Sequence, residues 1–269
     1  MLSQIFSNPG LFPTKTSISE SLFRSFAGWV FFGISRTNVC SYHWERFQRS
    51  LTKWLKLCLA REFLAARKLA RVTGRIISNF LIMGNVCKLM TKTTHRSIEC
   101  RRGWDAQVVL DSDVLVELKF WREQLQNLYS RPIWRKHVLP SRVVYSDASA
   151  VGCAAFMSMN GKPVSHKNWD AIEMKQSSTW RELVCVKHAL QSFANLRKGS
   201  HVKWYTDNKG VASIVKSGSS KAHLHKLAMK IFSLSKEHNV IIDIEWIPRS
   251  ENEVADYLSK IVDFDDWSV

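Results

Sequence analysis

Three short extended segments, followed by alternating helical and extended segments, constrain the fold of the second half of the chain. The extended segments are residues 142–147, 152–159 and 162–167, and Asn160-Gly161 between the last two is a strong signal for a hairpin turn. Expected helices at 179–196, 209–215, 222–238 and 250–259 then alternate with expected strands at 201–206 and 240–247. This order predicts an α/β domain at residues 141–262, a mixed five-stranded sheet with helices on both faces.

A smaller helical domain is expected before this sheet. From residue 44 to about residue 95 the apolar residues recur at helical intervals, and Gly74 and Gly84 interrupt them, which predicts two or three helices. A further helix is expected from about residue 111 to residue 128, and prolines after it mark a domain boundary. We therefore expect four regions: a poorly ordered N-terminal segment (1–40), a basic helical domain (41–135), the sheet domain (141–262) and a C-terminal tail (263–269).

Basic residues are concentrated in the first half of the chain. The 269 residues include 39 Lys and Arg against 23 Asp and Glu, a net charge of +16. Between Lys53 and Arg102 the basic side chains alternate with apolar ones at helical intervals, and Glu62 and Glu99 alone offset them. This pattern predicts amphipathic helices with a positive face that suits nucleic-acid phosphates. A solvated basic face that binds nothing is the alternative.

The composition also indicates the setting of the protein. The six cysteines are scattered, with no C-x-x-C pair and no zinc-like spacing, which is typical of thiols in a reducing compartment. No apolar run approaches the ~20 residues that a membrane-spanning helix needs. We therefore expect an intracellular protein, cytoplasmic or nuclear rather than secreted, without a membrane partner.

Four acidic residues lie where the expected elements would bring them together. Asp147 and Asp207 end two strands expected to be parallel neighbours, and open α/β sheets bind ligands at the carboxyl ends of such strands. Glu182 falls on the apolar face of a helix, and Asp256 lies near the start of the last helix. Several carboxylates without basic partners stay ionised together only around divalent cations. The placement predicts a site for two Mg²⁺ ions, or Mn²⁺, that serves phosphodiester chemistry.

Each of these residues also has an ordinary structural interpretation. Thr179-x-x-Glu182 and Ser250-x-x-Glu253 both match a helix capping box. Asp147 and Asp207 are equally typical of turns at strand ends. The case for a catalytic site therefore depends on the four carboxylates lying close together.

Four short motifs carry a resemblance to a known family: Tyr145-Ser-Asp-Ala-Ser149, Trp180-Arg-Glu-Leu183, Tyr205-Thr-Asp-Asn208 and the segment WIPRSENEVADYLS at 246–259. In this order they resemble the motifs of the type 1 ribonuclease H domain of retroelement reverse transcriptases, most of all those of DIRS-type (tyrosine-recombinase) retrotransposons. Outside this domain, further segments resemble the thumb and connection region that precedes it (67–78, 84–91 and 117–128) and the linker that follows it (265–267).

The resemblance implies a fold, an activity and a set of site residues. It implies a ribonuclease H-like domain that cleaves the RNA strand of RNA–DNA hybrids, with two Mg²⁺ ions held by Asp147, Glu182, Asp207 and Asp256. Backbone contacts to the nucleic acid are expected from the sheet domain (Asn208, Ser219 and Lys221) and from the helical domain (Arg67, Lys68, Arg71 and Arg75). For the loop at 217–221, a simple connector is the alternative.

Two features depart from the family pattern. Many relatives carry a His in the loop before the last helix, whereas residues 247–250 contain none, and we expect His223, His225 and His238 at the surface. The polymerase signature, an aromatic residue, any residue and two aspartates, is missing upstream. We therefore expect a reverse transcriptase fragment that lacks the polymerase site, with other reverse transcriptase domains as partners. The alternative is a catalytically inert nucleic-acid-binding relic of a truncated retrotransposon.

Overall fold

The computed structural model describes residues 39–128, 140–158, 163–193 and 200–262. The chain divides into two compact units, Met1–Lys53 and Trp54–Val269. The predicted hairpin turn, the C-terminal tail and residues 1–38 of the predicted N-terminal segment lie outside the described residues, and the predicted domain boundaries stay predictions. Among the helices that are described, none has both the length and the apolar character that crossing a bilayer requires.

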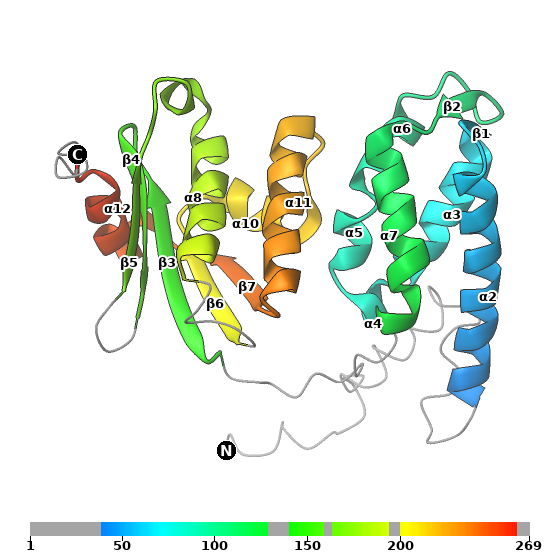
Figure 1. Cartoon of the computed structure of the whole chain (residues 1–269), viewed down its shortest axis with the longest axis horizontal. Helices are drawn as coiled ribbons and strands as arrows, with labels where there is room; N and C mark the ends of the chain where they lie inside the picture. The colour runs from blue at the N-terminus through cyan, green and yellow to red at the C-terminus, as the bar shows by residue number, and fades with distance from the viewer. Residues whose placement is uncertain (1–38, 129–139, 159–162, 194–199, 263–269) are drawn as a thin grey trace, which may run out of the picture. The chain divides into compact units, whose positions relative to one another are not determined.

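A mixed five-stranded sheet lies in the C-terminal half of the second unit, with strand order β5-β4-β3-β6-β7 (Figure 1). The antiparallel strands are β3 (Arg142–Ala148), β4 (Gly152–Met157) and β5 (Val164–Asn168). On the other side of β3, β6 (His201–Thr206) and β7 (Ile241–Trp246) run parallel to it. This arrangement confirms the predicted ribonuclease H-like mixed sheet.

Helices cover both faces of this sheet, as predicted. The long helix α8 (Ser178–Ser192) contacts β3, β4 and β5, while the short helix α12 (Glu253–Ser259) contacts β3 and β4 from the opposite face (Figure 1). The remaining elements are α10 (Lys209–Ser217), α11 (Ala222–Glu237) and two 3-10 turns, η1 (Glu173–Lys175) and η2 (Arg249–Glu251). The last helix is shorter than predicted because η2, which follows Pro248, takes up its expected first turn.

The central strand β3 is fixed from both faces of the sheet. Because side chains alternate along a strand, Ser146 faces one side while Tyr145 and Asp147 face the other. The buried Trp204 donates from Nε1 to the Ser146 hydroxyl at 2.8 Å, and Tyr145 stacks on Phe156 with ring centroids 5.0 Å apart. The strand that leads to Asp147 is therefore held by contacts on both sides.

The N-terminal half of the second unit is helical, but it contains more and shorter helices than predicted. They are α3 (Ala66–Ser78), α4 (Phe80–Met83), α5 (Val86–Leu89), α6 (Lys92–Glu99) and α7 (Ser112–Leu128), preceded by α2 (Val39–Leu59). Gly84 follows α4 as its C-cap with φ 72°, a left-handed backbone conformation that glycine adopts without steric cost. Gly74 lies inside α3, and the helix continues through it. Two strands missing from the prediction, β1 (Phe63–Ala65) and β2 (Gln107–Val109), pair antiparallel and are too short to show alternation.

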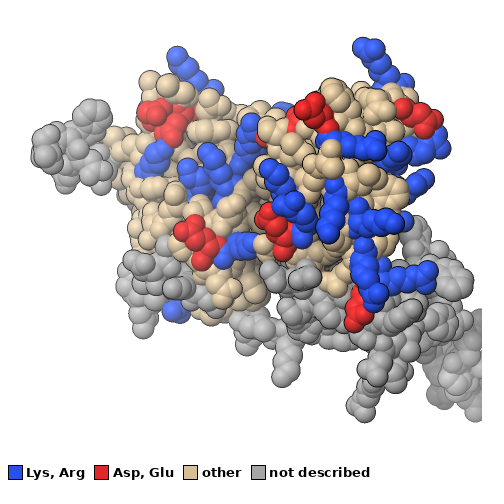
Figure 2. Space-filling model, turned by 45° about the vertical axis from the view of Figure 1, so that its right-hand side comes forward, with Lys and Arg blue, Asp and Glu red and all other residues tan. Residues whose placement is uncertain are grey.

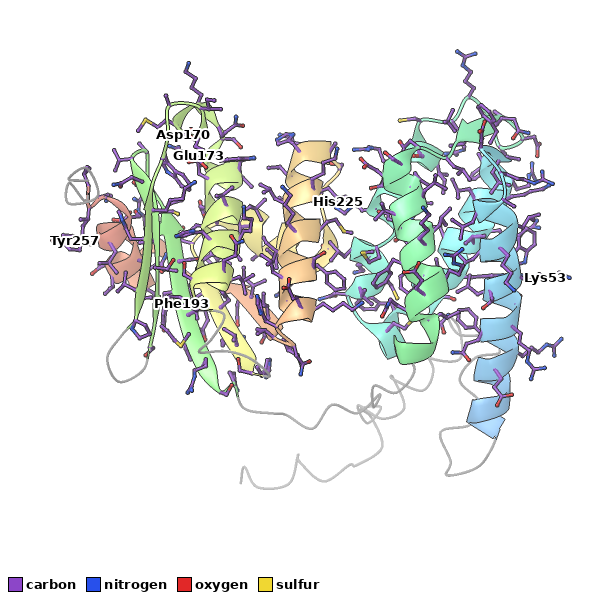
Figure 3. The ribbon with its side chains drawn as sticks, in the orientation of Figure 1. Lys53, Asp170, Glu173, Phe193, His225 and Tyr257 are labelled. Carbon is purple, nitrogen blue, oxygen red and sulfur yellow. The ribbon has the colours of Figure 1, made fainter. Side chains whose placement is uncertain are left out.

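A buried polar contact corrects the expectation that His225 lies at the surface. Glu117 is 1% exposed, and its carboxylate accepts the backbone N–H groups of Thr93 and Thr94 near the start of α6. His225 lies on α11 (Figure 3), and its Nε2 is 3.5 Å from Oε1 of Glu117. His225 is therefore a buried neighbour of a helix-capping carboxylate.

Candidate active site

The carboxyl ends of β3 and β6 bring Asp147 and Asp207 to the same edge of the sheet. The two strands are parallel with Tyr145 opposite Tyr205, and each Asp follows its Tyr by two residues. Asp147 is buried, and its Oδ2 accepts a hydrogen bond from the Ser259 hydroxyl at 2.8 Å. The backbone carbonyl of Asp207 accepts from Nε1 of Trp246 at 2.9 Å. The predicted neighbourhood of these two residues is thus present, with both backbones held in place.

Glu182 is buried beside the same edge and does not cap its helix. It is 8% exposed, and its two oxygens accept from the Thr206 hydroxyl at 3.1 Å and from Nδ2 of Asn208 at 2.8 Å. The N-cap of α8 is Ser177, whose hydroxyl accepts from the backbone N–H of Trp180. The capping-box interpretation of Thr179-x-x-Glu182 is therefore wrong, and the carboxylate faces the end of β6 instead.

Asn208 connects this carboxylate to the start of α10. Its Oδ1 accepts from the backbone N–H groups of Gly210 and Val211, and its Nδ2 donates to Glu182. All of these contacts are inside the protein. Asn208 therefore positions Glu182, and its predicted contact with nucleic acid stays a prediction.

Asp256 lies on α12 and is held by two cations of the protein. Its Oδ1 accepts from Nη2 of Arg249, on η2, and its Oδ2 lies 2.5 Å from Nζ of Lys260. The helix has Asn252 as its N-cap without a side-chain bond, so the second predicted capping box is not formed. The charge of the Asp256 carboxylate is thus balanced by Arg249 and Lys260, contrary to the expectation that this residue lacks basic partners.

Burial and neighbouring charges shift the pKa values of Asp147, Glu182 and Asp256. Burial raises the pKa of Asp147, and the charges of Asp207 and Asp256 raise it further. Burial raises the pKa of Glu182 to about 7, supported by the charges of Asp207 and Asp147 and opposed by the hydrogen bond from Asn208. Hydrogen bonds from Lys260 and Arg249 lower the pKa of Asp256. Burial therefore disfavours the ionised form of both Asp147 and Glu182.

The donor atoms suit a hard divalent cation, but they are not drawn together. Within the described residues, no group of three or more His, Cys, Asp or Glu side chains is placed to hold a metal ion. Carboxylate oxygens are nonetheless the ligands that Mg²⁺ and Mn²⁺ prefer, and two of the four are buried with unfavourable charge. The donor chemistry fits such an ion, and the predicted two-ion geometry stays a prediction.

The basic residues predicted to contact nucleic acid share one face of α3. The opposite face of this helix buries Leu69, Val72 and Ile76 against the core. The guanidinium of Arg67 pairs with Asp105 at 3.1 Å, and those of Arg71 and Arg75 lie 5.7 and 5.5 Å from the ring centroid of Trp54. Lys68 is exposed, as are Arg67 and Arg71. We call the basic face formed by Arg67, Lys68, Arg71 and Arg75 the α3 basic face.

The surface of the protein reflects this excess of basic residues. On the side drawn in Figure 2, Lys and Arg side chains gather with few Asp and Glu side chains between them. In the loop before α11, Lys221 is exposed, and its backbone N–H donates to the Ser219 hydroxyl at 3.2 Å. The structure thus places Lys221 at the surface, with Ser219 half-buried beside it.

Several residues that shape the site were absent from the prediction. Thr206 and Ser259 donate hydroxyl hydrogen bonds to the buried carboxylates, and Trp246 holds the backbone of Asp207. The pairing of Asp256 with Lys260 is a four-residue helical spacing, so the sequence did contain a signal for it. The other contacts join residues distant in sequence, for which a single sequence holds no local signal.

Comparisons with known proteins agree with this description of the sheet domain. Residues 144–262, less than half of the chain, match the family model described as "Reverse transcriptase-like". No curated protein sequence matches the chain.

Solved structures are similar to 44% of the chain or more. One is ribonuclease H1 from the halophilic archaeon Halobacterium salinarum NRC-1 (14% identity, TM-score 0.37, 44% of this chain and 92% of that chain). Another is the N-terminal ribonuclease H domain of a Mycobacterium tuberculosis protein (19% identity, TM-score 0.37, 44% of this chain and 94% of that chain). A third is the foamy viral protease-reverse transcriptase in complex with RNA/DNA hybrid (15% identity, TM-score 0.31, 73% of this chain and 26% of that chain). Residues 144–262 thus match the "Reverse transcriptase-like" family model and form a ribonuclease H-like mixed sheet with helices on both faces.

Proposed function

We propose that this protein is a metal-dependent endonuclease that cleaves the RNA strand of RNA–DNA hybrids. The observation that carries the proposal is the placement of Asp147 and Asp207 at the ends of the neighbouring parallel strands β3 and β6, with Glu182 bonded to Thr206 beside them. Asp256 joins this edge through Ser259, whose hydroxyl contacts the Asp147 carboxylate and the Asp256 carbonyl. The reverse transcriptase-like match over this domain supports it. The resemblance of the four motifs extends the proposal to a fragment of a DIRS-type retrotransposon enzyme.

In this proposal the four carboxylates hold Mg²⁺ or Mn²⁺, and the protein supplies the positioning. When bound, divalent ions would activate water and stabilise charge on the phosphodiester. Thr206 and Asn208 orient the Glu182 carboxylate, and Ser259 orients that of Asp147. The Trp246 hydrogen bond fixes the backbone at Asp207, so two carboxylates and the backbone that carries the third are positioned before substrate binds.

The experiment that tests the proposal is cleavage of a hybrid duplex whose RNA strand is labelled. With Mg²⁺ or Mn²⁺ the full chain is expected to cut the RNA strand internally, and excess chelator is expected to abolish cutting. Double-stranded DNA and RNA of the same sequence serve as matched controls and are expected to stay intact, because recognition needs one strand with 2′-hydroxyls and one without. Tight hybrid binding without metal-dependent cutting would instead favour the inert relic.

A second prediction concerns the α3 basic face. Replacing both Lys68 and Arg71 with Gln is expected to weaken hybrid binding. The slope of log affinity against log salt concentration is expected to become shallower by roughly one for each phosphate contact that is lost. The measurement is the hybrid affinity, in chelator, over a series of salt concentrations. Lys119 and Arg122 are also exposed, with the same three-residue spacing on α7, so their double Gln variant is the control. Equal slopes for both variants would show that α3 is an ordinary solvated face.

A further inference from the structure

Asp256 differs from the other three carboxylates in its partners. Arg249 and Lys260 both contact it, whereas Asp147 and Glu182 accept hydrogen bonds from neutral groups. Within the described part of the chain, Asp256 is also the one site carboxylate that pairs with a Lys or Arg side chain. One positive charge comes from η2 before α12, and the other follows the helix directly. The structure therefore contains two protein cations at a predicted ion ligand.

Both cations are free to move away from the carboxylate. The side chains of Arg249 and Lys260 are 70% and 54% exposed, while that of Asp256 is 18% exposed. Long side chains of this kind lose conformational freedom in an ion pair, and water screens their attraction, so such pairs are weak. A divalent ion shared by several carboxylates is a far stronger partner. Exchange of the protein cations for a divalent ion is therefore energetically accessible.

The exchange has an electrostatic reason to occur. The hydrogen bond and charge of Asp256 raise the pKa of Arg249, and the charges of Asp147 and Asp207 raise it further. A divalent ion among these carboxylates would repel both positive side chains. Tyr257, the neighbour of Asp256 on α12, is exposed and points away from the sheet (Figure 3).

We propose that Arg249 and Lys260 are internal counter-cations that occupy Asp256 in the ion-free protein and compete with the divalent ion for it. This inference rests on the proposed function, since it assigns the same carboxylate to the ion. Ion binding then requires Asp256 to release both side chains.

The experiment measures Mn²⁺ binding to the full chain without nucleic acid, from the electron paramagnetic resonance signal of free Mn²⁺. Arg249→Gln and Lys260→Gln are each expected to tighten Mn²⁺ binding by roughly 2- to 5-fold, the scale of an exposed ion pair. The double variant is expected to gain more than either. Arg122→Gln, which removes an exposed guanidinium from α7, is the control and is expected to leave the affinity unchanged.

A double-mutant cycle separates competition from a general change of charge. In an Asp256→Asn background, Arg249→Gln is expected to alter Mn²⁺ affinity much less, because the contested carboxylate is gone. Unchanged or weaker binding by Arg249→Gln would overturn the inference and assign Arg249 to holding Asp256 in place. An equal gain in both backgrounds would also overturn it. Because no nucleic acid is present, a protein that fails to cut hybrids but shows the expected gain refutes the proposed nuclease and leaves the inference standing.

Discussion

Replacing Asp207 with Asn is expected to reduce hybrid cleavage by roughly 10³-fold or more, since a metal ligand contributes several kcal/mol and each 1.36 kcal/mol is a factor of ten in rate. The fold should persist, because the Trp246 hydrogen bond goes to the backbone carbonyl of Asp207, which the substitution keeps. The substitution also removes a negative charge that raises the pKa values of Asp147 and Glu182, so it reduces the repulsion between buried carboxylates. The measurement is kcat/KM on labelled hybrid, with hybrid affinity in chelator measured in parallel.

The matched control for this prediction is Asp243→Asn. Asp243 lies on β7 of the same sheet, where it pairs with Lys203, and Lys203 keeps Glu245 as a partner when Asp243 is lost. This variant is expected to cut hybrid at close to the wild-type rate. Retained cleavage by Asp207→Asn would show that the carboxylates at the ends of β3 and β6 do not catalyse the reaction. A matching loss in both variants would indicate damage to the sheet instead.

The sheet was predictable from the sequence because its signals are local. Alternation marks β3, and regular helix–strand exchange marks the parallel side, so a mixed five-stranded sheet followed from general rules of connection. The strands β1 and β2, of three residues each, contain too few positions for a period to show. Likewise, Gly74 suggested a break that α3 does not make, since packing of its apolar face outweighs the low helix propensity of one exposed Gly.

The site was predictable in its members and less so in its contacts. The helical period placed Glu182 on the buried face of α8, and the strand ends placed Asp147 and Asp207 together. The partners of Glu182 lie 24 and 26 residues further along the chain, and the hydroxyl that reaches Asp147 lies 112 residues away. Such contacts depend on the packing of whole elements. The Arg249 pairing with Asp256 also depends on η2, which was expected to be part of a helix.

Replacing Glu182 with Gln is expected to abolish cleavage and, at the same time, to stabilise the ion-free protein at neutral and higher pH. The folded pKa of Glu182 is about 7, above its ordinary value of 4.5. The folded state therefore binds the proton more tightly than the unfolded state, and stability falls as pH rises from about 4.5 to about 7. Above that range the ionised carboxylate lowers the free energy of unfolding by about 3 kcal/mol, because a pKa difference of one between the two states corresponds to about 1.36 kcal/mol. Gln carries no charge and avoids this penalty.

The measurement is urea unfolding of the full chain in chelator at pH 4 and pH 8. The gain from Glu182→Gln should be large at pH 8 and nearly absent at pH 4, where the wild-type carboxyl is protonated in both states. Glu237→Gln, on the exposed surface of α11, is the matched control and should change little at either pH. Excess Mg²⁺ should narrow the difference at pH 8, because an ion that binds only the folded wild type raises its stability. A Gln variant less stable than the wild type at pH 8 would show that hydrogen bonding from Thr206 and Asn208 outweighs the burial of charge, and would make Glu182 a structural residue.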